Sequence, residues 1–176
     1  PAFHDAIWRD TKINRVILNV GGFANISVLN ADADTFGYDT GPGNVLLDAW
    51  VAIHQGKTYD ASGQWAATGT VHQGLLESLL NEPYFHWPAP KSTGRDGFHL
   101  PWLNAHLANF SNIAAADVQA TLLQLTCKTI VNEIHRSAPQ IHELIICGGG
   151  AYNTQLVKQL TQALPTVRVE MSSAHG

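Results

Sequence analysis

One carboxylate, Asp39, stands in a setting that could support acid–base chemistry. It ends a run expected to form a strand and is followed by Thr40-Gly41-Pro42-Gly43-Asn44. A carboxylate in such a place can act as a general base or hold a metal-bound water, and the helix expected to begin at Asn44 would offer backbone amides to an anion. Alternatively, Asp39 caps that helix or bonds its own loop. Two glycines flanking a proline exceed what a cap requires, so both interpretations stay open.

Two glycine clusters are the next candidates for binding a ligand. Gly21-Gly22 separates two β-branched apolar runs and indicates a hairpin turn, whose amides can face an anion. A hairpin that needs positive φ explains the same pair. Gly148-Gly149-Gly150 joins an apolar run to a helical pattern that opens at Asn153, and bare backbone of this kind lets a flat ligand lie close. A tight turn would need only one or two glycines, and the cluster matches neither the dinucleotide nor the P-loop motif.

A charged segment, Lys91-Ser92-Thr93-Gly94-Arg95-Asp96, is the last candidate. Two cations among small hydroxyl residues suit a carboxylate or a phosphate, although a solvated loop with a capping box between Thr93 and Asp96 explains them as well. Asp48, inside the expected helix, indicates a surface or capping charge. The nine histidines are dispersed, and the sequence has no Cys-x-x-Cys pair and no Gly-x-Ser-x-Gly elbow. No metal ligands are therefore expected, and metalloprotease, thiol-redox and serine-hydrolase chemistry lose support.

The elements that must position these residues follow from hydrophobic periodicity. Two-residue alternation and short apolar runs predict strands over 15–20, 25–29, 35–38, 143–147 and 167–171. A 3.6-residue repeat predicts helices over 44–56, 75–80, 101–110, 117–138 and 153–164. Antiparallel strands followed by βα alternation imply an α/β fold, a mixed five-stranded sheet with helices on both faces. This is the layout of a ribonuclease-H-like lobe, here with a helical insertion over about 57–112.

Composition limits the classes of function that remain. The chain has 176 residues, 45% hydrophobic and 14% charged, with a formal net charge of -4, which indicates a globular domain with a real core. No basic face is available for nucleic acid, and no apolar run approaches the ~20 residues of a membrane helix. Two cysteines are too few for a disulfide framework, and the first residues are unlike a signal peptide, so we expect the protein in the reducing cytoplasm. Without an initiator Met, and ending in an expected loop, the chain is expected to be truncated at both ends.

Taken together, the motifs closely resemble the anhydro-N-acetylmuramic acid kinases. The resemblance runs in family order from Pro1-Ala2-Phe3-His4 to the end, through Leu18–Ser27, Gly37–Asn44, Tyr84-Phe85, Pro90–Arg95, Asp117–Leu122 and Cys147–Gly150. It implies the actin, hexokinase and Hsp70 fold group, in which two ribonuclease-H-like lobes close over ATP. Residues 1–176 look like the C-terminal lobe of such a bacterial cytoplasmic kinase, lacking the helix that follows the fifth strand. The N-terminal lobe would then be its partner.

The same resemblance implies the reaction and the roles of residues. ATP and water would convert 1,6-anhydro-N-acetylmuramic acid into N-acetylmuramic acid 6-phosphate during peptidoglycan recycling, with Mg²⁺ bridging the phosphates. Asp39 matches the catalytic base that takes a proton from the attacking water. Gly21, Gly22 and Asn25 would face the ATP phosphates, and Gly148, Gly149, Gly150 and Asn153 the adenosine. The residues assigned to a sugar or anion loop are Thr40, Gly41, Pro42, Lys91, Ser92, Thr93 and Arg95.

Other functions are compatible with the same fold. Another sugar or acetate kinase of the same fold group shares most of these features, and a sugar-responsive regulator would use the scaffold without catalysis. A metal-dependent nuclease of this fold is disfavoured because residues 15–29 contain no Asp or Glu. The isolated chain is expected to bind nucleotide weakly, without turnover. An apolar sheet face left by the missing helix favours self-association, and a homodimer is one arrangement of the whole protein.

Overall fold

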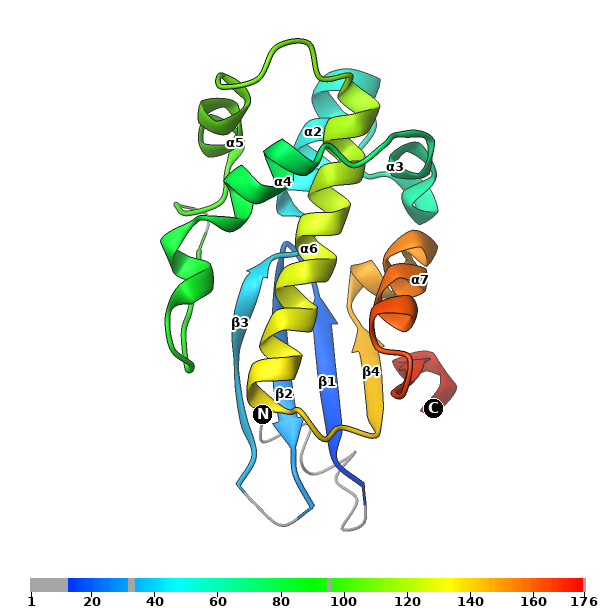
Figure 1. The fold of residues 1–176 in the computed structure, drawn as a ribbon. Helices are drawn as coiled ribbons and strands as arrows, with labels where there is room; N and C mark the ends of the chain where they lie inside the picture. The colour runs from blue at the N-terminus through cyan, green and yellow to red at the C-terminus, as the bar shows by residue number, and fades with distance from the viewer. Residues whose placement is uncertain (1–12, 32–33, 95, 176) are drawn as a thin grey trace.

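A five-stranded mixed sheet forms the centre of the structure, a computed structural model that describes residues 13–31, 34–94 and 96–175 (Figure 1). Its strands are β1 (Arg15–Val20), β2 (Phe23–Leu29), β3 (Phe36–Pro42), β4 (Glu143–Cys147) and β5 (Arg168–Met171). Their order across the sheet is β3-β2-β1-β4-β5. The first three pair antiparallel as a meander, whereas β4 is parallel to β1 and β5 is parallel to β4. The predicted mixed sheet is confirmed.

Helices cover the sheet and extend beyond its end. They are α2 (Val45–Gln55), α3 (Gln64–Thr68), α4 (Gln73–Leu80), α5 (Leu100–Leu107), α6 (Ala115–Ser137) and α7 (Thr154–Ala163). The 3₁₀ turns are η1 (Ala61–Gly63), η2 (Pro83–His86), η3 (Gly149–Tyr152) and η4 (Ser172–His175). Helix α6 runs along the strands, and α2 to α5 gather around its N-terminal half (Figure 1). None of the helices in the described part of the chain is long and apolar enough to span a membrane.

Alternation along the strands divides the buried side chains between two faces. Val16, Leu18 and Val20 of β1 belong to the main core, which also takes in apolar side chains of α6 and α7. Ile17 points to the other face, where it packs with Leu29 and Ile145. Within the described ranges this second cluster consists of strand residues only. Helices were expected on both faces, but α6 and α7 both pack on the main-core face.

Strand β3 is longer than the sequence predicted. The expected loop from Asp39 to Pro42 continues the strand, because β3 lies at an edge of the sheet, where proline's missing N–H need not break a ladder. Asp39 pairs with Asn25 and Gly41 with Ala24, so Thr40 is the extra residue of a β-bulge. Periodicity cannot detect this arrangement, since Gly and Pro ordinarily indicate a turn.

Two helices of the 57–112 stretch begin with a histidine as cap. The Nδ1 atom of His72 accepts a hydrogen bond from the Leu75 amide at 3.1 Å, at the start of α4. His99 does the same for the Trp102 amide at 3.0 Å, at the start of α5. These nitrogens satisfy amides that the first helical turn leaves unpaired. The sequence offered little signal for either cap, because Ser, Thr, Asp and Asn are the residues usually found there.

A buried carboxylate ties three strands together at the end of the sheet where β1 begins. Glu143 of β4 accepts hydrogen bonds from the guanidinium groups of Arg15 on β1 and Arg168 on β5. The Glu143 side chain is 1% exposed. Burial acts to raise the pKa of Glu143, but the two arginines outweigh it and hold that pKa below its usual range.

This ion pair predicts a pH-dependent stability. Because the folded-state pKa of Glu143 is lowered, its stabilisation should be complete above the ordinary value of 4.5 and disappear as pH falls through the folded pKa. Glu143→Gln should lower the free energy of unfolding by roughly 3 kcal/mol at neutral pH and remove part of the loss below pH 4.5. Urea unfolding of the original protein and of Glu143→Gln from pH 3 to pH 7 measures this. The same change of unfolding free energy with pH in both proteins would refute it.

Candidate functional site

The hairpin turn between β1 and β2 is locked onto the start of α2. The carbonyl of Gly22 accepts hydrogen bonds from the amides of Gly43 (2.9 Å) and Val45 (3.0 Å), and the carbonyl of Gly21 from the amide of Asn44 (2.8 Å). A Cβ on Gly43 would lie 2.4 Å from the Gly21 oxygen, so only glycine allows this approach. The amides of Asn44 and Val45 are therefore engaged by the turn, which corrects the expectation that the amides at the very start of this helix are open to an anion.

Asp39 lies in a polar row across the sheet, close to this turn. Direct pairing places Asp39 beside Asn25 on β2, Asn25 beside Asn19 on β1, and Asn19 beside Cys147 on β4. Their neighbours Tyr38, Ile26, Leu18 and Ile146 belong to the main core, so the row faces away from α6. Asp39 is thus neither directed into the main core nor remote from the glycine turn. Of the residues predicted to face phosphate, Asn25 shares its row.

One oxygen of the Asp39 carboxylate carries both of its described hydrogen bonds. Asp39 Oδ2 accepts from the Ser92 hydroxyl at 3.2 Å and from the Thr93 amide at 3.1 Å. Beside it is a cavity of about 370 Å³, lined by Gly37, Tyr38, Asp39, Pro90, Lys91 and Ser92. The structure thus places Ser92 and Thr93, which the sequence assigned to a sugar or anion loop, as hydrogen-bond donors to the Asp39 carboxylate. Arg95 lies outside the described residues.

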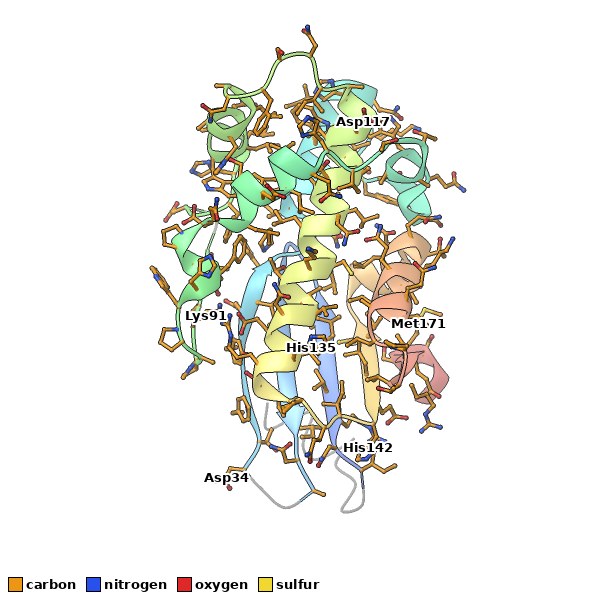
Figure 2. The ribbon with its side chains drawn as sticks, viewed as in Figure 1. Asp34, Lys91, Asp117, His135, His142 and Met171 are labelled. Carbon is orange, nitrogen blue, oxygen red and sulfur yellow. The ribbon has the colours of Figure 1, made fainter. Side chains whose placement is uncertain are left out.

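Lys91 is a buried structural cation. Its ammonium group donates to Glu133 Oε1 on α6 at 2.6 Å and to the Tyr84 carbonyl at 3.1 Å. It also lies 5.0 Å from the centre of the Tyr84 ring. Lys91 sits in the segment beside β3 (Figure 2). The expectation that its charge serves a sugar or anion is wrong, because Glu133 already neutralises it away from solvent.

Three further members of the expected sugar or anion loop support the core instead. The Thr40 hydroxyl donates to the Ala24 carbonyl at 3.2 Å, and the Pro42 carbonyl accepts from the Thr126 hydroxyl at 3.1 Å. A Cβ on Gly41 would lie 2.8 Å from the Phe85 ring. All three residues are buried. The bulge turns this part of β3 inward, so the assignment of these residues to a ligand loop is corrected.

The triple glycine divides into two structural positions and one open position. A Cβ on Gly148, at φ +79°, would lie 2.5 Å from Asn19 Oδ1, and one on Gly150 would lie 2.3 Å from Val20 Cγ1. At Gly149 the nearest atom is Asn44 Nδ2 at 3.9 Å. Close packing against β1 therefore requires Gly148 and Gly150, whereas Gly149 borders open space.

A second cavity, of about 380 Å³, lies beside Gly149. It is lined by Asn44, Leu47, Asp48, Tyr59, Asp60, Ser62, Gly149, Tyr152 and Asn153. The Asn153 side chain accepts from the Leu156 amide at 3.1 Å and caps α7, so this predicted residue has a structural bond as well as a place in the cavity wall. Tyr152 is 76% exposed and Tyr59 63% exposed, so their rings can receive a flat group.

Asp48 connects this cavity to a third one. The third cavity, of about 720 Å³, is lined by Gly22, Phe23, Val45, Asp48, Ala49, Phe98, His99, Leu100 and Pro101. Asp48 is half-buried, and burial raises the pKa of its carboxyl group. The sequence indicated a surface or capping charge here. The signal that could have found it is its position four residues after Asn44, on the same face of a helix that is otherwise apolar from Val45 to Ile53.

Metal ligands do not cluster in the part of the chain that the structure describes. No group of three or more His, Cys, Asp or Glu side chains is arranged there to hold an ion.

Comparison with known proteins gives a consistent result along the whole chain. The family model described as "Anhydro-N-acetylmuramic acid kinase" matches residues 1–176. The anhydro-N-acetylmuramic acid kinase of Pseudomonas fluorescens is 47% identical over 176 residues, which are 100% of this chain and 48% of the relative. That of Photobacterium profundum is 48% identical over 183 residues, with the same coverage of 100% and 48%. The chain spans about half the length of these curated relatives.

Solved structures resemble the fold at low sequence identity. The activator of the 2-hydroxyisocaproyl-CoA dehydratase from Clostridium difficile, with bound ADPNP, matches with a TM-score of 0.57 and 15% identity, over 96% of this chain and 56% of that one. Component A of the (R)-2-hydroxyglutaryl-CoA dehydratase from Acidaminococcus fermentans has a TM-score of 0.56 and 13% identity, over 89% and 54%. These likenesses confirm the predicted actin-like ATPase fold class and show the fold alone.

The glycine geometry predicts a sharp difference between neighbouring positions. Gly148→Ala and Gly150→Ala should each lower the free energy of unfolding by about 1–3 kcal/mol, because the new methyl group overlaps β1. Gly149→Ala should change it by less than about 0.5 kcal/mol. Urea denaturation of the three variants checks this, and equal losses at all three positions would show that the open space beside Gly149 is not real.

Proposed function

Because the chain belongs to the anhydro-N-acetylmuramic acid kinase family, we propose that it is the C-terminal lobe of a bacterial enzyme that opens and phosphorylates 1,6-anhydro-N-acetylmuramic acid. ATP and water are the other substrates, and N-acetylmuramic acid 6-phosphate and ADP the products. The observation that carries this proposal is the Asp39 carboxylate, which is held through one oxygen beside a cavity. Its strand, β3, pairs with β2, the strand that follows the Gly21-Gly22 turn. The N-terminal lobe would close the site from the opposite side.

Asp39 would act as the general base. Ser92 and Thr93 both donate to its Oδ2 atom, which fixes the orientation of the carboxylate, and Oδ1 would then accept the proton of the attacking water. As Asp39 takes a proton from that water, the oxygen attacks the anomeric carbon and the bond from this carbon to O6 breaks. O6 then attacks the γ-phosphorus and ADP leaves. An inverting glycosidase needs a second carboxyl group to protonate the leaving oxygen, whereas here phosphoryl transfer takes up its charge.

The cavities suggest how a nucleotide would lie. The adenine would enter the cavity beside Gly149, with the exposed rings of Tyr59 and Tyr152 as stacking surfaces. Asp48 lines both this cavity and the one that reaches Gly22, so its carboxylate is placed to accept hydrogen bonds from ribose hydroxyls. The phosphates would then extend toward the Gly21-Gly22 turn and Asn25.

Mg²⁺ would bind chiefly through the phosphate oxygens, since the described residues offer no three-ligand cluster. When bound, it would neutralise charge that develops on the transferred phosphoryl group. We place the enzyme in the cytoplasm, where ATP is available and where Cys127 and Cys147 would remain the free thiols found here.

Replacing the proposed base is the direct test of this function. In the full-length gene product, Asp39→Asn should lower kcat for the anhydro sugar by about 10²–10⁴-fold, because the amide cannot take the proton. ATP affinity, measured by calorimetry, should stay unchanged. The exposed Asp34 supplies a matched control, and Asp34→Asn should keep normal turnover. Normal turnover by Asp39→Asn would remove Asp39 from its role, and faster phosphorylation of hexoses or acetate would point to another kinase.

The placement of adenine gives a separate prediction. In the full-length gene product, Gly149→Ala and Gly149→Val should weaken ATP binding in that order, the valine by roughly tenfold or more, because its side chain would fill the space beside Asn44. The affinity for the anhydro sugar should not change. Calorimetric titration with ATP measures both variants, and unchanged ATP affinity in the valine protein would exclude this cavity as the adenine site.

A further inference from the structure

The contacts of Asp39 outside the sheet converge on one segment of the chain. We refer to residues 84–93 as the holding segment. The Asp39 amide donates to the Lys91 carbonyl at 3.1 Å, and the Asp39 carbonyl accepts from the Tyr84 hydroxyl at 2.7 Å. Its carboxylate accepts from Ser92 and Thr93 of the same segment. Where this segment lies therefore decides where both the backbone and the carboxylate of Asp39 lie.

Much of the holding segment is exposed, so a few buried residues must fix it in place. Residues 86–90 are all exposed, and the Trp87 side chain is 53% exposed. Tyr84 and Phe85 anchor one end by aromatic packing, whereas Lys91 anchors the end that precedes Ser92 and Thr93. The Lys91 side chain is only 2% exposed. A residue of this type is rarely so deep unless a charge compensates it.

Glu133 of α6 provides that compensation. Its Oε1 atom accepts from Lys91 at 2.6 Å and from Arg136 at 2.9 Å, and its Oε2 atom from the Tyr38 hydroxyl at 2.8 Å. Burial, assisted by Glu133, raises the pKa of Tyr38 to about 12, so that hydroxyl remains a donor. Both carboxylate oxygens are thus engaged, and the loss of Glu133 would leave the buried Lys91 ammonium group without the charge that compensates it.

We infer that Lys91 and Glu133 are positioning residues for the catalytic base, because their buried ion pair holds residues 84–93 against α6 and thereby orients Asp39. Neither side chain needs to touch a substrate. The inference rests on the proposed function of Asp39. It adds that catalysis depends on a buried ion pair, which acts on Asp39 by fixing the positions of Ser92 and Thr93.

The chain contains a matched control for this idea. Glu143 is also a buried carboxylate, with two arginine partners, and its side chain is 1% exposed against 3% for Glu133. It joins β1, β4 and β5 and has no described contact with Asp39 or with the holding segment. Loss of either carboxylate should therefore destabilise the fold in a similar way, whereas only the loss of Glu133 should release Asp39.

The experiment compares these substitutions in the full-length gene product. Glu133→Gln and Glu143→Gln should both lower Tm, but only Glu133→Gln should lower kcat, by roughly 10- to 100-fold, with KM for ATP unchanged. Lys91→Met should reproduce the kcat loss, and Lys91→Arg should restore part of the activity. Ser92→Ala removes one donor from an exposed residue, so it should lower kcat without lowering Tm, even if the buried variants fail to fold.

Two results would overturn the inference. One is a loss of kcat that follows Tm equally in Glu133→Gln and Glu143→Gln, and the other is full activity in Ser92→Ala. Asp39→Asn, measured in parallel, separates this inference from the proposed function. If Asp39→Asn keeps turnover, the proposed function fails. If it loses turnover while Glu133→Gln behaves like Glu143→Gln, only the positioning role fails.

Discussion

The β-bulge at Thr40 is the constraint on which the arrangement of the site depends. It lets Tyr38 and Gly41 both face α6, which strict alternation along a strand would forbid. Asp39, between Tyr38 and the bulge, is left on the opposite face in line with Asn25. Core contacts therefore fix β3 before and after Asp39, while the Asp39 carboxylate itself lies outside the main core, beside a cavity. Since β3 is an edge strand, this irregularity leaves the inner strands undisturbed.

Close backbone contacts hold together the wall of the two cavities beside α2. Gly43 brings the start of α2 against the β1–β2 turn, and Gly148 and Gly150 bring η3 against the end of β1. In each place a methyl group would collide with main chain or a branched side chain. The turn, α2 and η3 thus meet at the end of one strand, and this junction brings Gly22, Asp48 and Gly149 to neighbouring cavities. The three consecutive glycines therefore differ in function: Gly148 and Gly150 allow close packing on β1, and Gly149 borders a cavity.

Two buried carboxylates organise the outer parts of the sheet in different ways. Glu143 joins neighbouring strands through Arg15 and Arg168, whereas Glu133 holds a non-regular segment to α6 through Lys91. Buried ion pairs are weak sources of net stability because desolvation offsets much of their attraction. Their geometric effect is clearer here, since Lys91 is a buried charged anchor of a segment whose middle is exposed. The supports of Asp39 depend on that anchor.

Local pattern was sufficient to predict the strands, the longest helices and the mixed sheet, because apolar side chains repeat with the period of the element that buries them. The resemblance in motifs also indicated the family, and it implied a base at Asp39 and contacts of both glycine clusters with ATP. It could not separate Gly149 from Gly148 and Gly150, which are identical residues and differ only in what β1 places beside them. Nor could it reveal that Asn153 caps α7.

Tertiary structure alone decided the roles of Lys91, Thr40, Gly41, Pro42 and Asp48. The residues around Lys91 have the composition of an anion-binding loop, but Glu133, 42 residues away on α6, neutralises the Lys91 charge. Thr40 to Pro42 have the composition of a turn, yet the register of β3 on β2 makes them a buried bulge. Asp48 lines two cavities only because α2 lies between them. Charge pairing and strand register act between residues distant in sequence, so local composition contains no record of them.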